Sequence, residues 1–323
     1  MIHVINATSK IHLVLSIASI CVITTFILQT LLLFYRWPSE QSSRTILQIP
    51  RDNSDSETLL RSGTPFRKQS ITHTQAELDA HTGQPYFLQA GESEVLVHYD
   101  SRYYLGSPVS DEDRRNTLHH LIRAYVTFFR DHNLQSWIAH GTLLGFWWNA
   151  QILPWDMDID VQVPEAVLFR LGKQYNMTAY GYQEVENSNS NTEVRQRHYI
   201  LDVNPNIFER EKGWGDNVID ARFIDISNGL YIDITGISQF RADEADAHVG
   251  IWKCKNNHRY DEDNIWPLRE TLFEGIVTTV PNRYEAILIR EYGSRALSST
   301  KYHGHEWSTA ERGWIKSSRS LEV

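Results

Sequence analysis

The chain has 323 residues, a formal net charge of −9 and an isoelectric point near 5.9, and no Lys/Arg cluster offsets this acidity, so nucleic acid is not expected as a partner. A hydrophobic content of 41% and 10 Trp indicate a substantial core, and the length allows one large domain with extra segments rather than two full domains. Cys21 lies in an apolar run and Cys254 stands alone, so the cysteines predict no disulfide in the soluble part and do not fix the compartment.

Residues 13–35 form an uncharged apolar run that is long enough to cross a bilayer as a helix, which needs about 20 residues. We predict a single-pass signal anchor here, after a short tail at residues 1–12. The run is too long for the apolar part of a cleaved signal peptide, and a buried core helix is the alternative. Basic residues flank the run on both sides and do not decide its orientation. The short tail favours a type II arrangement with a luminal C-terminal domain.

Residues 36–85 are expected to be a flexible stem, because their first part is rich in Ser, Thr, Arg and Gln with little apolar periodicity. The folded domain is expected to span residues 86–315. The tripeptide Asn176-Met-Thr178 matches the N-glycosylation sequon, which would report a luminal domain, although such tripeptides are common by chance.

The first strong helical pattern runs from Asp111 to Asn133, with apolar residues on one face and Ser110 or Asp111 able to cap its start. Trp137–Ala139 is predicted to be a short buried strand. A turn of His140, Gly141 and Thr142 then leads into a second helix that ends near Asn149. A helix start of this kind presents backbone N–H groups and the positive end of the helix dipole, which together can bind a phosphate.

Acidic or polar residues alternate with apolar ones from Asp156 to Val163, which predicts a half-buried β-strand. One face of this strand would carry Asp156, Asp158, Asp160 and Gln162. Carboxylates gathered in this way repel each other, and a hard divalent cation such as Mg²⁺ or Mn²⁺ would relieve the repulsion. The alternative is a solvated edge strand with scattered acidic residues.

Two further alternating runs meet at Asn228-Gly229, the strongest short-range signal for a β-hairpin. A two-residue turn would pair Ile224 with Asp233 and make Arg222 the diagonal neighbour of Asp233 on the same face. The pair has two interpretations. It is a structural ion pair, or it supplies a further metal carboxylate beside a cation that meets a phosphate.

The remaining segments carry weaker signals. Residues 178–217 are predicted to be mainly loops, and residues 271–281 a hairpin. Asn282 is expected to cap a helix that runs to Tyr292 and is stopped by Gly293.

Four residues near the C-terminus have side chains that can bind metals: Cys254, His258, His303 and His305. Cys254 and His258 make a poor zinc site without further ligands, so structural roles are favoured for both. The two later histidines are interpreted as packing or substrate-site rim residues, and ordinary surface histidines are the favoured alternative.

The run from His140 to Gly145, followed by Ile152 to Val161, resembles the LicD family, which includes fukutin and the fukutin-related protein. The family's pattern is a G-T-L-L-G turn and helix, then I-P-W-D-x-D-x-D, then a strand with a lone Asp, and finally V-P before a helix ending in Y-G. Asp233 fits the lone Asp, and Val280-Pro281 with Tyr292-Gly293 fit the last element. The resemblance covers roughly Asp111 to Gly293. The cysteine-rich zinc element of some members has no counterpart here.

This resemblance implies an α+β, nucleotidyltransferase-like fold with a mixed β-sheet flanked by helices. It also implies an enzyme that moves a phospho-alcohol or sugar phosphate from a CDP- or GDP-activated donor onto a glycan or glycoprotein. By position, Asp158, Asp160 and Asp233 match the family's metal carboxylates, so we expect Mg²⁺ or Mn²⁺ there, with Asp156 orienting the turn or binding a second cation. The anchored, acidic layout is similar to fungal members, which implies a Golgi or endoplasmic reticulum membrane location.

The phosphate-binding positions implied are His140, Gly141 and Thr142, with Arg222 offsetting phosphoryl charge. One carboxylate, Asp233, is expected to accept the proton of the acceptor hydroxyl. Two other functions compete with this one. The domain could be a non-catalytic partner that binds glycan or donor and supports another membrane-bound transferase. It could also be an ordinary D-x-D glycosyltransferase, which is disfavoured because the region before Asp156 is too short for a nucleotide-binding half.

Overall fold

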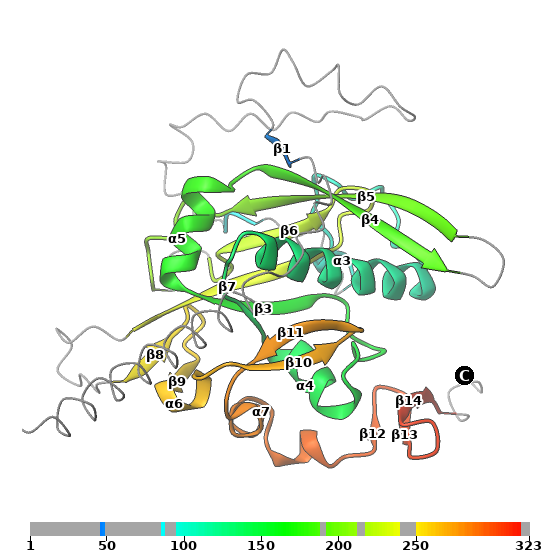
Figure 1. Cartoon of the computed structure of the whole chain (residues 1–323). Helices are drawn as coiled ribbons and strands as arrows, with labels where there is room; N and C mark the ends of the chain where they lie inside the picture. The colour runs from blue at the N-terminus through cyan, green and yellow to red at the C-terminus, as the bar shows by residue number, and fades with distance from the viewer. Residues whose placement is uncertain are drawn as a thin grey trace, which may run out of the picture. The chain divides into compact units, whose positions relative to one another are not determined.

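The computed structural model describes residues 46–48, 85–87, 95–187, 192–211, 217–239 and 250–317 (Figure 1). The predicted tail and membrane anchor lie outside these residues. Within the described ranges, no helix combines the length and apolar character needed to cross a membrane. Three residues of the predicted stem form strand β1 (Ile46–Gln48), which pairs with a strand of the main sheet. The boundaries of anchor, stem and domain stay a prediction.

The fold is α+β, as expected, and a nine-stranded mixed sheet forms its centre. Seven strands follow the order β1-β4-β5-β6-β7-β3-β2, and β8 and β9 extend the sheet from β7. The strands after β1 are β2 (Trp137–Ile138), β3 (Ile159–Pro164), β4 (Thr178–Asn187), β5 (Thr192–Val203), β6 (Ala221–Asp225), β7 (Tyr231–Gln239), β8 (Ile251–Lys253) and β9 (Arg259–Asp261). All their pairings are antiparallel except one: β3 runs parallel to β7 in the middle of the sheet.

Helices flank this sheet. The long helix α3 (Asp111–Asp131) packs on β4, β6 and β7, and α5 (Glu165–Gln174) packs on β3 and β7. The predicted cap of α3 is confirmed, since the Ser110 hydroxyl accepts a hydrogen bond from the Asp113 N–H. The apolar face of α3 is buried against aromatic residues of the sheet, with the Tyr125 and Phe223 rings 5.9 Å apart. This packing anchors the helix that later reaches the candidate site.

The predicted loops at residues 178–217 are wrong for much of their length, because β4 and β5 form a long antiparallel hairpin there. The inward side of the hairpin carries aromatic and aliphatic residues, among them Tyr180, Tyr199 and Leu201, which are all buried. Some intervening positions are polar, but Ile200 between Tyr199 and Leu201 is also buried, so the hydrophobic alternation is incomplete and the sequence signal for strands is weak here.

The hairpin at Asn228-Gly229 exists, but its turn is longer than predicted. The Asp225 and Leu230 backbones pair, which leaves a four-residue loop from residue 226 to residue 229. Side chains stabilise this loop: the Asp225 carboxylate accepts the Ser227 N–H, and the Asn228 carbonyl oxygen accepts the Leu230 N–H. The register shifts by two residues relative to the prediction, so every side chain keeps its predicted face.

The C-terminal part contributes smaller elements beside α4 (His140–Asn149) (Figure 1). The predicted hairpin is confirmed as β10 (Arg269–Phe273) and β11 (Ile276–Val280). Helix α6 (Glu262–Ile265) precedes it, and α7 (Tyr284–Tyr292) contacts α4 and ends at Gly293, which has a φ of 77°. Asn282 does not cap α7; its side-chain oxygen Oδ1 instead accepts from the Arg269 guanidinium. A short 3₁₀ helix, η3 (Ser294–Leu297), leads to a three-stranded sheet of β12 (Lys301–Tyr302), β13 (His305–Ser308) and β14 (Gly313–Lys316).

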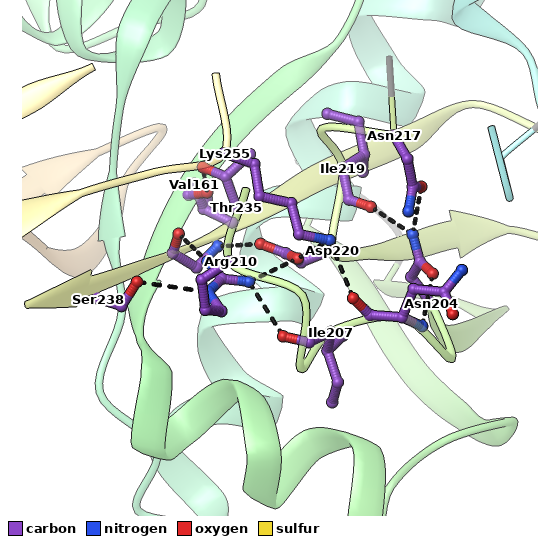
Figure 2. A network of polar contacts seen from close by, with 12 residues as sticks. Val161, Asn204, Ile207, Arg210, Asn217, Ile219, Asp220, Thr235, Ser238 and Lys255 are labelled. Carbon is purple, nitrogen blue, oxygen red and sulfur yellow. Dashed lines mark hydrogen bonds and ion pairs between the residues drawn. The ribbon is translucent and has the colours of Figure 1, made fainter. Parts of the chain in front are cut away.

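A network of buried polar contacts ties the middle of β7 to neighbouring loops (Figure 2). The Asp220 carboxylate accepts from the Gly236 N–H at 2.7 Å and from the Arg210 guanidinium at 2.9 Å, and it pairs with the Lys255 ammonium at 3.0 Å. Asn204, which is fully buried, links the same region to Asn217. Each charged group in this network has an opposite charge or a backbone partner.

Candidate functional site

The carboxylate-bearing segment is partly turn and partly strand. Strand β3 begins at Ile159, so the predicted strand from Asp156 is three residues too long at its start. The Asp156 N–H instead closes a turn onto the Leu153 carbonyl at 2.9 Å. Asp156 and Asp158 therefore lie in the approach to the strand, and Asp160 lies within it.

Asp160 and Asp233 are brought together by the one parallel pairing of the sheet. The register of β3 and β7 places the two residues directly side by side, so their side chains share a face. Burial, followed by the charges of Asp158, Asp233 and Asp156, raises the pKa of Asp160 well above its usual range. The pKa of Asp233 is also raised, by burial first, although Arg222 opposes the shift. The structure thus gathers the four predicted carboxylates into one electrostatic cluster.

Asp156 shows the consequence of this crowding. Its pKa rises to about 7, chiefly because the side chain is buried and secondly because Asp158 is near. Its carboxylate lies against Gly141: a Cβ added there would meet the Asp156 Oδ2 atom at 3.2 Å. The glycine of the predicted phosphate turn is therefore the residue that lets Asp156 approach the start of α4.

The other two residues of that turn also have defined partners. The Thr142 hydroxyl is buried and accepts the Asp160 N–H at 2.9 Å, while the Ala139 N–H donates to the Asp160 carbonyl at 3.0 Å. Both backbone groups of Asp160 are thus held by the start of α4. Thr142 positions a carboxylate here, and the imidazole of His140 turns toward Glu291 rather than toward the cluster.

Arg222 lies directly opposite Asp233 in the β6–β7 ladder and donates to its Oδ1 atom at 2.8 Å. The guanidinium lies over the Tyr231 ring, 3.7 Å from its centroid, and 4.9 Å from the Phe87 centroid. Only 2% of Arg222 is exposed. These contacts fix the orientation of the Asp233 carboxylate, and the positive charge of Arg222 offsets part of the negative charge of the aspartate cluster. The predicted contact of Arg222 with a phosphate stays a prediction.

Sequence reasoning missed Arg114, which clamps the carboxylate-bearing turn. This buried side chain of α3 donates to the Asp156 carbonyl at 2.8 Å and to the Pro154 carbonyl at 3.0 Å. The planar guanidinium can span two carbonyls in this way, whereas a lysine cannot. Its position on the helix carried no sequence signal, because the turn that it holds lies 40 residues further along the chain.

His98 is the second residue that the sequence did not reveal. It ends the 3₁₀ helix η1 (Leu96–His98), which the Tyr231 hydroxyl anchors by donating to the Val97 carbonyl. The His98 Nδ1 atom lies 3.0 Å from the Asp158 carboxylate. Burial works to lower the pKa of His98, but the hydrogen bond and the nearby carboxylates outweigh it and the pKa is raised. A partly exposed imidazole thus covers the cluster.

A second group of side chains that could hold a metal lies beside the cluster: His140, His258 and Glu291, whose ligand atoms are all within 4.8 Å of one another. The sequence had given His258 no such partners. Hydrogen bonds already link His140 and Glu291, whereas the buried Nδ1 atom of His258 has no hydrogen-bond partner within the described part of the chain. The His140 Nδ1 atom contacts Glu291 at 3.0 Å, the Tyr260 hydroxyl donates to the other Glu291 oxygen, and the Gln162 amide faces the remaining nitrogen of His140. We therefore interpret these residues as a support for the start of α4.

Trp155, next to Asp156, is surrounded by aromatic residues of the C-terminal three-stranded sheet. Its ring centroid lies 5.2 Å from that of Tyr302, 5.4 Å from that of His305 and 5.0 Å from that of Trp314. His303 stacks on the same ring. Both histidines contact the Trp155 ring, and His303 is exposed, as expected for a surface histidine. Tyr302 is 55% exposed, so part of this aromatic surface faces solvent beside the carboxylates.

The residue types of the aspartate cluster fit a hard divalent cation, although among the described residues it is the ligand atoms of His140, His258 and Glu291 that already lie within 4.8 Å of one another. Asp158, Asp160 and Asp233 offer carboxylate oxygens, which Mg²⁺ and Mn²⁺ prefer, and their mutual repulsion leaves a local need for positive charge. A mixed α+β domain with acidic residues on neighbouring strands is the arrangement that the resemblance to a nucleotidyltransferase-like fold implied.

Comparisons with known proteins agree with this resemblance. The profile of the LicD/FKTN/FKRP nucleotidyltransferase domain matches residues 133–283. Two similar proteins of Saccharomyces cerevisiae are mannosyltransferase regulator 4, 34% identical over 151 residues, and mannosyltransferase regulator 14, 35% identical over 165 residues. These matches cover 46% and 48% of this chain but 12% and 16% of the relatives. Residues 133–283 therefore match the LicD-family domain, and the chain spans less than a fifth of the length of the two relatives, whose names describe regulators of mannosyltransferases.

Proposed function

We propose that the domain catalyses metal-dependent transfer of a phospho-sugar or phospho-alcohol group from a CDP- or GDP-activated donor onto a glycan. One observation carries this proposal: Asp160 and Asp233 lie side by side on parallel strands, with Asp158 and Asp156 close enough to raise the pKa of Asp160. Such a cluster costs stability in the absence of a cation. Its retention therefore favours a chemical role.

Asp158, Asp160 and Asp233 would hold Mg²⁺ or Mn²⁺, with Asp156 able to take part. When bound, the ion neutralises charge on the donor's diphosphate and makes the nucleoside monophosphate a better leaving group. The chain's own residues prepare this arrangement. Arg222 fixes Asp233, while Thr142 and Ala139 fix the Asp160 backbone.

In the reaction proposed, the acceptor hydroxyl attacks the phosphorus that is attached to the transferred group, and the nucleoside monophosphate leaves. A carboxylate of the cluster accepts the hydroxyl proton. We assign this step to Asp233, through the carboxylate oxygen that neither the cation nor Arg222 engages. The half-exposed aromatic surface around Trp155 borders the same cluster, which supports placing the acceptor sugar on that side.

The location proposed is a Golgi or endoplasmic reticulum membrane, with the domain on the luminal side. The uncharged run at residues 13–35 supports an anchor, and the glycosylation-related relatives support the secretory pathway.

The test uses purified protein and a panel of CDP- and GDP-linked donors, with and without Mn²⁺. Release of a nucleoside monophosphate that depends on the ion and on a glycan acceptor is the expected result. Asp158→Ala should abolish it while the thermal transition stays cooperative, and Asp263→Asn, an exposed acid of α6, should leave it intact. Normal turnover by Asp158→Ala would refute the proposal.

The names of the two relatives favour a second candidate, a regulator that supports a mannosyltransferase without its own chemistry. This function predicts that no donor is hydrolysed under any condition. It also predicts that Asp158→Ala still restores mannosylation in cells that lack the protein. The two functions therefore give opposite results with the same variant.

A further inference from the structure

The turn that follows α5 carries the N-glycosylation sequon Asn176-Met-Thr178. The sequon residue Asn176 lies in the turn between α5 and β4, and its side chain is exposed. Its Oδ1 atom accepts the Val203 N–H at 2.9 Å. Because this bond fixes the amide oxygen against β5, the amide nitrogen Nδ2 points to the other side.

Asn176 also lines a cavity of about 420 Å³. Two phenylalanines form its apolar wall: Phe169 and Phe208, whose ring centroids are 4.9 Å apart. Phe208 is 72% exposed, so its ring is accessible to a group attached beside it. Lys173 lines the opening with a hydrogen-bond donor, and the buried Asn204 of the polar network in Figure 2 forms part of the floor.

We propose that Asn176 carries an N-linked glycan whose first sugars lie over Phe169 and Phe208. The amide nitrogen forms a bond to C1 of the first sugar of a polyprenyl-diphosphate-linked oligosaccharide. The bond between C1 and the diphosphate oxygen breaks, the polyprenyl diphosphate leaves with the electron pair, and Nδ2 loses one proton. Attachment at the rim of the cavity places the apolar faces of the sugars within reach of the exposed ring, while their hydroxyl groups face Lys173 and water.

This inference rests on the luminal location proposed above and not on the transfer reaction. The chain has a second sequon, Asn6-Ala-Thr8, on the other side of the predicted anchor. The two positions therefore report opposite orientations. A protein that is glycosylated at Asn176 but releases no nucleotide would refute the enzymatic proposal alone, and an unmodified active enzyme would refute this one alone.

The first experiment expresses the full chain in yeast and measures its electrophoretic mobility before and after digestion with an N-glycosidase. The wild type should shift by one glycan, Asn176→Gln should not shift, and Asn6→Gln should behave like the wild type. Thr178→Ser keeps the sequon and should keep the shift, which controls for disturbance of the turn. A wild-type protein that does not shift, or a shift that survives in Asn176→Gln, would overturn the proposal.

The second experiment tests whether the glycan covers the cavity. Melting temperatures are compared for glycosylated protein from yeast and unmodified protein from bacteria, each with Phe208 and with Phe208→Ala. Glycosylation should raise the melting temperature by about 2 °C when Phe208 is present and by much less in the variant, because the variant lacks the ring that the sugar contacts. Equal shifts in both backgrounds would show that the glycan does not contact the ring.

Discussion

Two clusters of buried charge lie along β7, and they are built in opposite ways. Near the start of the strand, Asp233 joins the acidic residues of the β3 segment, and its partner is Arg222. Three residues later, Gly236 donates to Asp220, whose carboxylate also contacts Arg210 and Lys255 (Figure 2). One cluster gathers several acids, and the other surrounds one acid with two cations.

We infer from this difference that the Asp220 network stabilises the fold, whereas the acidic cluster serves function. A buried carboxylate with cationic and backbone partners is matched inside the protein, so the Asp220 network holds loops to the sheet. The acidic cluster is not matched, as the raised pKa values of Asp156 and Asp160 show. A group that is unfavourable for folding is expected where a ligand supplies the missing charge. Four predictions can break or sharpen this comparison.

The largest effect is expected for activity in the acidic cluster. Asp160→Asn should lower transfer at least about 1,000-fold, because it removes an oxygen charge where phosphoryl charge must be neutralised. The same change should leave the folded state as stable as before or more stable, since it relieves repulsion. Donor turnover and urea unfolding of the same preparation measure both quantities. If Asp160→Asn lost activity only because it unfolds, the acidic cluster would be a stabilising network like that of Asp220, and the account would be contradicted.

The opposite pattern is expected in the network of Figure 2. Asp220→Asn leaves Arg210 and Lys255 buried without their carboxylate, so the free energy of unfolding should fall by about 3–5 kcal/mol. Activity per folded molecule should remain near that of the wild type. Equilibrium urea unfolding with activity measured well below the midpoint tests this. An unchanged unfolding midpoint would contradict the stabilising role of the network.

Arg114→Lys should lower kcat/KM by about 10- to 100-fold, because a lysine cannot hold both carbonyls of the turn and Asp156 and Asp158 would shift. Arg123→Lys is the matched control, since Arg123 lies on the same helix and donates to the Glu274 carbonyl, away from the cluster. If Arg114→Lys and Arg123→Lys had equal activities, Arg114 would not be needed to position the turn that carries Asp156.

The smallest effect concerns pH. The folded-state pKa of Asp156 is about 7, above its ordinary value, so the native state binds more protons than the unfolded state between about pH 4 and pH 7. This contribution to stability is complete below the unfolded pKa and is lost as the pH rises toward 7. The difference in melting temperature between pH 5 and pH 7.5, measured in a chelator, should therefore shrink in Asp156→Asn. It should also shrink when Mn²⁺ is added to the wild type, and no change in either case would contradict the assigned repulsion.

The central juxtaposition could be predicted from the sequence because two local patterns defined it. Alternation around Asp160 and around Asp233 indicated two strands, and the Asn228-Gly229 signal indicated the hairpin that carries the second. The predicted register was wrong by two residues, but an even shift preserves faces, so Arg222 still meets Asp233.

The supporting residues could not be predicted in this way. Arg114 and His98 act across long stretches of chain, and a single sequence gives no sign of which turn a helix or a 3₁₀ segment will contact. Thr142 shows a different limit. Its position at a helix start predicts phosphate binding through the backbone, and the folded chain adds a contact that the sequence did not reveal, between its hydroxyl and the Asp160 N–H. Local motifs identify the reactive groups, and tertiary contacts decide which residues position them.

Titration of the purified protein with Mn²⁺, followed by electron paramagnetic resonance of the free ion, tests the central claim most directly. The account predicts one site in the wild type that is lost in Asp160→Asn and in Asp233→Asn but retained in His258→Ala, whose side chain belongs to the neighbouring group. Binding that survives both aspartate substitutions and disappears in His258→Ala would contradict it, and so would a wild type that binds no Mn²⁺.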